Sequence, residues 1–128
     1  MHGHKIVVIE DEADLRFIYK LKLERTGFEV RDAGGGAEGF KIIAEFRPDL
    51  VLLDLLMPGM SGTEMLARLR EQEWASNIRV VVLTNISKTE APAALRFLSV
   101  DRYIVKAHHT PAQIAEIVQE VLHGGAPQ

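Results

Sequence analysis

The sequence predicts an α/β fold in which helices cover both faces of a five-stranded parallel β-sheet. Five short apolar runs, at residues 6–9, 28–30, 50–53, 80–83 and 103–105, are separated by segments with helical spacing of apolar residues. Three of these runs are rich in Val, Ile and Leu without alternation, as expected for strands buried on both faces. The repeated strand–helix order therefore favours a doubly wound sheet with right-handed crossovers.

The first two helices have different sequence support. The first predicted helix carries an apolar stripe within about 160° of arc, formed by Leu15, Phe17, Ile18 and Leu21. Gly27 supplies its stop signal. The second helix, at about residues 37–46, follows three glycines and contains Gly39, which lowers its helix propensity.

Capping boxes predict the starts of the third and fourth helices. In this motif a Ser or Thr side chain and a Glu or Gln three residues later each accept a backbone N–H of the first turn. Ser61 with Glu64 fits the third helix, and Ser87 with Glu90 fits the fourth. Pro92 falls in the first turns of the fourth helix, where proline is tolerated.

The last helix has the clearest signals. Thr110 and Gln113 form a third capping box, with Pro111 at the first helical position. Its apolar stripe, which ends before Gly124, consists of Ile114, Ile117, Val118 and Val121. We therefore expect one domain at residues 5–123, between an N-terminal tail at 1–4 and a flexible C-terminal tail at 124–128.

Composition restricts the functional classes. The 128 residues include no cysteine, which fits a reducing compartment such as the cytoplasm. The net charge of −3 gives no reason to expect direct binding to nucleic acid. The sequence has no run long enough for a membrane helix and no signal-peptide pattern. We thus expect a cytoplasmic protein with no membrane contact.

Polar residues gather at the predicted carboxyl ends of the strands, where such sheets bind ligands. Glu10 and Asp11 follow the first strand, Asp54 the third, Thr84 ends the fourth, and Lys106 follows the fifth. Clustered carboxylates repel one another unless a cation joins them, and Mg²⁺ prefers such oxygen ligands. Asp54 would then act as a nucleophile toward a phosphoryl group, with charge supplied by Lys106 and the metal.

The sequence resembles the receiver domains of two-component response regulators. The resemblance rests on four motifs in the expected order, which are KIVVIEDE at 5–12, DLLMPGMSG at 54–62, VVLT at 81–84 and YIVK at 103–106. It extends over about residues 4–123. It implies a flavodoxin-like (βα)5 fold with strand order 2-1-3-4-5.

The resemblance also implies roles for individual residues. Asp54 matches the phosphoacceptor, and Lys106 matches the lysine that contacts the phosphoryl group. The implied Mg²⁺ ligands are Glu10 (through water), Asp11, Asp54 and the backbone carbonyl of Leu56. Thr84 and Tyr103 match the pair that rearranges on phosphorylation. The implied donors are a histidine kinase, a histidine phosphotransfer protein or a small phosphodonor such as acetyl phosphate.

Some positions depart from the family pattern. Ala107 stands where proline is usual, and a cis peptide before a residue other than proline costs about 2.5–4 kcal/mol. Asn85 replaces a small residue and would crowd the phosphoryl group. Leu56 and Ile86, which flank the approach of the hydrolytic water, are apolar and cannot orient it. We therefore expect slow autodephosphorylation.

We expect a signalling module and not an enzyme, with an output surface made by the fourth helix, the fifth strand and the fifth helix. The apolar character of the fourth helix indicates a downstream protein partner or a homodimer there. Two alternatives stay open. One is a receiver-like scaffold that binds partners without phosphorylation. The other is an aspartyl-phosphate phosphatase, which normally carries a second aspartate at the position of Leu56.

Overall fold

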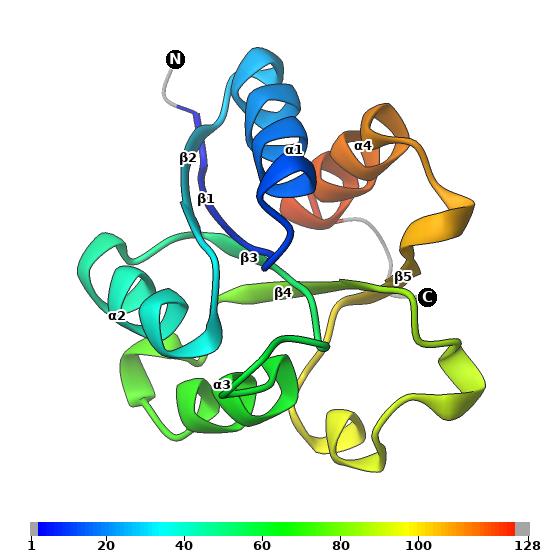
Figure 1. Ribbon diagram of the computed structural model, residues 1–128. Helices are drawn as coiled ribbons and strands as arrows, with labels where there is room; N and C mark the ends of the chain where they lie inside the picture. Colours follow the sequence, from blue (N-terminus) through cyan, green and yellow to red (C-terminus); the bar gives the residue numbers. More distant parts are fainter. Residues whose placement is uncertain (1–2, 125–128) are drawn as a thin grey trace.

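A parallel sheet of five strands forms the centre of the computed structural model, which describes residues 3–124 (Figure 1). The strands are β1 Lys5–Ile9, β2 Glu29–Ala33, β3 Leu50–Leu53, β4 Arg79–Thr84 and β5 Arg102–Val105. Their order across the sheet is β2-β1-β3-β4-β5, and every neighbouring pair is parallel. The predicted fold and strand order are confirmed.

Helices cover both faces of the sheet, as Figure 1 shows. The α-helices are α1 Ala13–Thr26, α2 Gly36–Phe46, α3 Gly62–Arg70 and α4 Pro111–Leu122. Four short 3-10 helices complete the described chain, namely η1 Glu73–Ala75, η2 Lys88–Glu90, η3 Ala93–Phe97 and η4 Lys106–His108. Helices α1 and α4 pack on one face of the sheet, and α2 and α3 pack on the other.

Two apolar clusters, one on each face, form the core. Because successive strand residues point to opposite faces, Val51 and Leu53 of β3 join the cluster under α2 and α3. Leu50 and Leu52 join the cluster under α1 and α4. All four residues are at most 1% exposed. The unbroken apolar run of β3 is thus explained by burial on both faces.

The second strand lies further along the chain than predicted. It spans Glu29–Ala33 and not residues 28–30. Val30 and Ala33 are buried, Asp32 is half-buried, and Glu29 and Arg31 are exposed. This strand is at the edge of the sheet, so it carries polar residues that an apolar-run criterion misses.

The predicted apolar stripe of the first helix lies only partly on its buried side. Phe17 is 65% exposed and Ile18 is 43% exposed. The core side of α1 is formed by Leu15, which belongs to the predicted stripe, and by Tyr19 and Leu23, which follow at intervals of four residues and are buried. The amphipathic spacing was correct for a helix, but the tyrosine was not counted as a core residue.

The fourth predicted helix, between β4 and β5, is not a regular α-helix. The segment forms the two 3-10 helices η2 and η3, separated by Ala91 and Pro92. Ala91 is extended, with φ −62° and ψ 144°. Pro92 disfavours the helical conformation of the residue before it, so the chain cannot continue as one helix there. Phe97 is 84% exposed, and Leu95 is the only residue of η3 that is buried.

Of the three predicted capping boxes, only that of α4 is complete within residues 3–124, and Ser87 accepts no backbone N–H at the start of η2. The Thr110 hydroxyl accepts the N–H of Gln113, and the Gln113 side chain accepts the N–H of Thr110, which completes the capping box of α4. Ser61 accepts the N–H of Glu64 at the start of α3. Gly27 ends α1 with a φ of +111°. Of the predicted tails, residues 1–2 and 125–128 lie outside the described residues.

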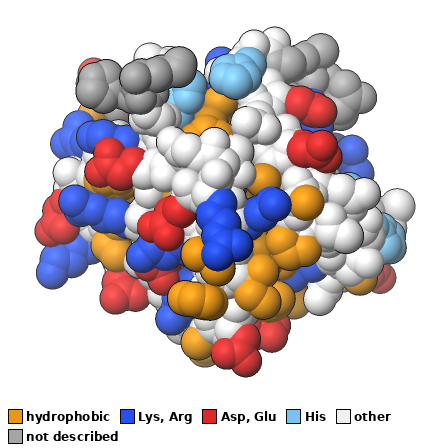
Figure 2. Space-filling model, turned by 90° about the horizontal axis from the view of Figure 1, so that it is seen from above, with side chains coloured by type: hydrophobic (Ala, Val, Ile, Leu, Met, Phe, Trp, Pro, Cys, Tyr) orange, Lys and Arg blue, Asp and Glu red, His pale blue; other side chains and the backbone are white. Residues whose placement is uncertain are grey.

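The surface is mixed in charge. On the face shown in Figure 2, acidic and basic side chains are interspersed, with hydrophobic side chains between them. Among residues 3–124, no helix has the length and apolar character that crossing a bilayer requires.

Candidate functional site

Three carboxylates meet where β1 and β3 end. Glu10 and Asp54, the residues directly after β1 and β3, are 2% and 5% exposed, and Asp11 is exposed beside them. One carboxylate oxygen from each of the three lies within 4.8 Å of the others. Parallel strands bring their carboxyl ends to one edge of the sheet, so this convergence follows from the fold.

Lys106 joins the two buried carboxylates. Its Nζ lies 2.8 Å from Asp54 Oδ2, to which it donates a hydrogen bond, and 2.6 Å from Glu10 Oε1. The contact with Glu10 is an ion pair between two buried side chains. Burial of the ammonium opposes its charge, but hydrogen bonding and attraction from Asp54 and Glu10 outweigh burial and raise the pKa of Lys106 to about 12. Lys106 is therefore positively charged in this site at neutral pH.

Glu10 is held in a less favourable environment. Burial raises the pKa of its carboxyl, while Lys106 and the Glu12 N–H lower it, and burial is the larger effect. Its Oε2 accepts the N–H of Glu12 at 3.1 Å. A buried carboxylate with a raised pKa gains from any cation that comes close. The chemistry of this donor set, all oxygen and all acidic, fits Mg²⁺.

The loop after β3 is shaped around Asp54. The Asp54 backbone N–H donates to Ile9 O at 3.0 Å, and the Leu56 N–H donates to Asp54 Oδ1 at 3.2 Å. Gly62 approaches so closely that a Cβ placed on it would lie 2.1 Å from Asp54 O. The Asp54 side chain is therefore fixed by contacts on both of its oxygens and behind its backbone.

Thr84 and Tyr103 lie on the two strands beside this cluster. Thr84 is fully buried, and its hydroxyl has no hydrogen-bond partner among the described residues. Tyr103 is partly buried, and its hydroxyl donates to Ile86 O at 2.8 Å. Burial, and secondarily the charge of Asp54, raises the pKa of Tyr103. Both predicted switch residues are thus close to the end of β4.

Arg16, which the sequence reasoning missed, supports the acidic loop. It donates from Nη1 to Glu10 O at 2.8 Å and from Nε to Asp32 Oδ2 at 2.9 Å. The arginine thereby joins α1 to the ends of β1 and β2. No motif in the sequence marks it, because one partner is a backbone carbonyl and the other, Asp32, is 16 residues away.

The peptide between Lys106 and Ala107 is trans, since no cis peptide bond occurs within residues 3–124. Ala107 in place of proline is therefore accommodated by a trans peptide. A cis peptide would be costly before any residue other than proline.

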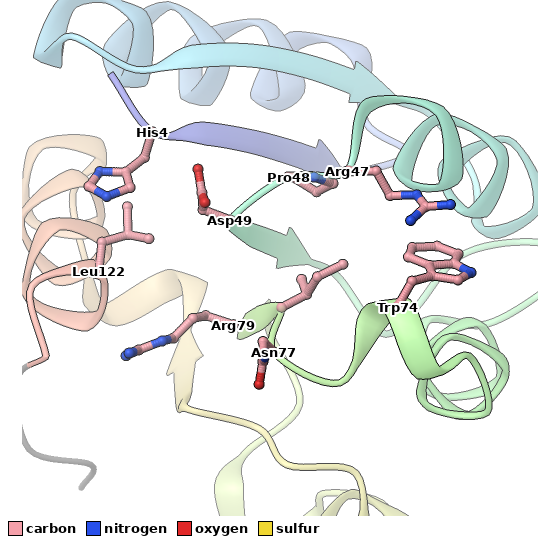
Figure 3. Close-up of a pocket in the computed structure, with 9 residues that line it drawn as sticks. His4, Arg47, Pro48, Asp49, Trp74, Asn77, Arg79 and Leu122 are labelled. Carbon is pink, nitrogen blue, oxygen red and sulfur yellow. The ribbon is translucent and has the colours of Figure 1, made fainter. Parts of the chain in front are cut away.

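A pocket of about 350 Å³ lies at the opposite edge of the sheet (Figure 3). His4, Asp49 and Arg79 line it, from the amino-terminal ends of strands, together with Arg47 stacked on Trp74. It contains none of the predicted site residues. The convergent acids and the lysine, not this pocket, mark the candidate functional site.

A family model, described as the response regulator receiver domain, matches residues 6–119. The chain belongs to this family. The receiver domain places its acidic cluster, its lysine and its buried threonine at the strand ends, as the four sequence motifs predicted.

Curated relatives are response regulators and related proteins. The receiver domain is 33% identical over 129 residues to the phosphate regulon transcriptional regulatory protein PhoB of Pseudomonas aeruginosa, covering 99% of this chain and 55% of that protein. It is 34% identical over 84 residues to the sporulation initiation phosphotransferase F of Bacillus subtilis, covering 66% of each. The chain spans about half the length of most of the curated relatives it matches.

Solved structures support the same fold. A CheY-like receiver domain protein from Methanospirillum hungatei superimposes with a TM-score of 0.86 and 26% identity, covering 94% of both chains. A LuxR-family DNA-binding response regulator from Staphylococcus aureus has a TM-score of 0.83 and 29% identity, covering 93% of this chain and 98% of that one.

These relatives do not support the expectation that the protein avoids nucleic acid. Several, such as MtrA of Mycobacterium leprae, are named DNA-binding regulators. The expectation came from the net charge of this one domain, which says nothing about a domain joined to it.

Proposed function

We propose that this receiver domain is a switch, operated by phosphorylation of Asp54 in a Mg²⁺-dependent reaction, within a domain spanning residues 5–123. The observation that carries the proposal is the pairing of the buried Asp54 carboxylate with Lys106 at 2.8 Å, beside two further acids. A carboxylate oxygen attacks the phosphorus of a phosphohistidine. The P–O bond of an acyl phosphate forms, the P–N bond breaks, and the released imidazole takes up a proton.

The acidic residues hold the metal in this proposal. Asp11 and Asp54 would provide carboxylate oxygens, Glu10 would act through a water molecule, and the Leu56 carbonyl would provide a backbone oxygen. Mg²⁺ supplies charge neutralisation for the phosphoryl oxygens when it is bound. Lys106, which already contacts Asp54, supplies a second positive charge from the protein itself.

Thr84 and Tyr103 transmit the change. A buried hydroxyl without a partner gains a hydrogen bond when a phosphoryl oxygen arrives within reach. We propose that Thr84 moves toward the phosphoryl group and that the Tyr103 ring then turns inward, giving up its bond to Ile86 O. The output surface consists of η2, η3, β5 and α4, with 3-10 helices in place of the expected regular helix, and it receives a downstream protein or a second copy of the chain.

The cell compartment and the donor follow from the same assignment. We propose a cytoplasmic protein that receives its phosphoryl group from a histidine kinase or a histidine phosphotransfer protein. Leu56 and Ile86, both apolar, do not orient a hydrolytic water, so the phosphorylated form decays slowly. Decay within seconds in excess Mg²⁺, followed by intact mass, would contradict this last point.

Intact-mass measurement tests the switch. Wild-type protein incubated with acetyl phosphate and Mg²⁺ should gain one phosphoryl group, and Asp54→Ala or removal of the metal by a chelator should abolish the gain. Asp14→Ala is the matched control, because Asp14 is an exposed acid in the first turn of α1. It should leave the gain unchanged.

Beryllofluoride, an analogue of the bound phosphoryl group, extends the test to receivers that accept phosphate only from their kinase. A wild-type protein that neither gains mass nor binds beryllofluoride with Mg²⁺ is not a phosphorylation switch. That outcome would favour the scaffold that acts without phosphorylation.

A further inference from the structure

We propose that Asn85 is a positioning residue for Lys106, acting through a hydrogen bond to the backbone of Ala107. The Ala107 N–H donates to Asn85 Oδ1 at 3.2 Å, across 22 positions of sequence. Asn85 directly follows Thr84, and Ala107 directly follows Lys106. The bond therefore joins the two segments that leave the site from β4 and β5. The inference rests on the proposed function, in which Lys106 contacts the phosphoryl group.

The side chain of Asn85 continues the hydrogen bonding between the two strands beyond the end of the sheet. Pairing of β4 with β5 runs from Val81 with Arg102 to Thr84 with Val105 and goes no further. The Asn85 amide oxygen accepts the N–H of Ala107. A backbone carbonyl of β4 would have taken this role if the strand pairing had continued by one residue. A small apolar residue at position 85 has no side-chain oxygen and could not do this.

The segment that carries Lys106 has little else to hold it. Within the described residues, the backbone of Ala107 and His108 makes no other hydrogen bond to a different element. The remaining bonds near it, from His109 to Lys106 O and Val105 O, are local and 3.3 Å long. The bond from Ala107 to Asn85 is thus a cross-link that holds the backbone of η4 to the end of β4.

The position of this backbone matters because Lys106 must reach two groups at once. Its Nζ lies 2.6 Å from Glu10 Oε1 and 2.8 Å from Asp54 Oδ2, and its side chain is 8% exposed. A long side chain holds such a position only when its backbone is fixed, because freeing the backbone restores rotamer freedom to the lysine.

The two departures from the family pattern compensate each other in this arrangement. Proline at position 107 would have no N–H to donate. Alanine restores the N–H, and Asn85 supplies its acceptor. Asn85 and Ala107 are both exposed, so the bond adds little to the free energy of unfolding and acts on local order.

Amide exchange tests the bond without any phosphodonor. In wild-type protein the Ala107 N–H should exchange more slowly than in Asn85→Ala, by about three- to tenfold, which is the expected effect of one neutral hydrogen bond. Asn85→Asp keeps an acceptor oxygen and should keep the protection. Equal exchange in wild type and Asn85→Ala would overturn the proposal.

A double-mutant cycle tests the consequence for Lys106. Asn85→Ala should weaken binding of beryllofluoride with Mg²⁺ by about three- to tenfold in wild type and in Ala107→Gly, which keeps the N–H. It should have no further effect in Ala107→Pro, which lacks the N–H. An equal effect in Ala107→Pro would mean that Asn85 contacts the phosphoryl group itself, and the positioning role would be refuted.

The NMR signal of the Lys106 ammonium gives an independent readout if Ala107→Pro does not fold or if wild type does not bind beryllofluoride. In Asn85→Ala this signal should broaden and move toward that of a free lysine, while thermal unfolding stays unchanged. An unchanged Lys106 signal would overturn the proposal. If wild type failed to bind beryllofluoride while Asn85→Ala still changed the Lys106 signal and the exchange of the Ala107 N–H, that outcome would count against the proposed function alone.

Discussion

Gly62→Ala should disturb the phosphoacceptor although it leaves the acidic residues in place. A Cβ at this position would lie 2.1 Å from Asp54 O and 2.8 Å from Leu55 Cα. Both are backbone atoms, so no side-chain rotation can relieve the contact. Gly62 does not have a positive φ, so the requirement at this position is for space and not for a left-handed conformation.

The loss of stability caused by Gly62→Ala follows from these short distances. Carbon atoms in ordinary contact lie about 3.5–4.0 Å from their neighbours, so α3 or the β3–α3 loop must move by more than about 1 Å. Overpacking of this kind usually costs about 1–3 kcal/mol, and contact with backbone places this case at about 3 kcal/mol. For a domain of this size the midpoint of thermal unfolding should fall by roughly 9–15 °C.

Thermal and denaturant unfolding measure the effect on stability, and intact mass after acetyl phosphate treatment measures the effect on Asp54. Gly35→Ala is the matched control, because its Cβ would meet nothing within 4 Å and its backbone is extended, with φ −160°. It should cost no more than about 1 kcal/mol. If Gly62→Ala proves as stable as Gly35→Ala and is phosphorylated at the wild-type rate, the steric argument is refuted.

Three further outcomes can be checked directly. Arg70 donates hydrogen bonds at 2.9 Å to three carbonyls, those of Ala75, Leu98 and Ser99. Arg70→Met should therefore lower the free energy of unfolding by about 2–3 kcal/mol in urea titration, whereas Arg68→Met, an exposed change on the same helix, should alter it by less than about 0.5 kcal/mol. Burial raises the pKa of both Tyr19 and Tyr103, so ultraviolet titration should place phenolate formation above that of unfolded protein. Since the folded state holds these protons more tightly, their contribution to stability is full below about pH 10 and is lost as the pH rises through the folded-state pKa values; coincident titration curves would contradict this. Asp11→Ala should weaken Mg²⁺ binding by about tenfold or more in calorimetric titration without changing the unfolding midpoint, because Asp11 is an exposed member of the acidic cluster.

The sheet and the location of the site could be predicted because both depend on local and repeated patterns. The run at residues 50–53 is apolar without a break, which only burial on both faces explains, and Asp54 follows it directly. Once the strands were assigned as parallel, the sheet edge that gathers Glu10, Asp54 and Lys106 followed from topology. The capping box of α4 was readable because both of its partners lie within one turn.

The errors occurred where tertiary contacts decided between local preferences. Tyr19 is a core residue of α1 because its ring packs under the sheet, while Phe17, more apolar, lies in solvent. Arg16 could not be assigned because it bonds to a carbonyl and to an edge strand that was itself misplaced. Neither choice is visible in residue spacing alone.

The irregular segment between β4 and β5 bears on how a change at Asp54 would reach the surface. Thr84 is buried, and its hydroxyl has no hydrogen-bond partner within residues 3–124. Such a state costs about 1–3 kcal/mol, so a phosphoryl oxygen beside the hydroxyl would draw it away from its resting position. The carbonyl of Ile86, two residues after Thr84, accepts the hydrogen bond from the Tyr103 hydroxyl. Movement of Thr84 should therefore strain that bond first. The chain beyond it forms only short 3-10 helices with one buried residue in η3. Because that segment buries few side chains, it should change conformation before the sheet does. The Tyr103 ring should then turn toward the core, and β5 should keep its register in the sheet.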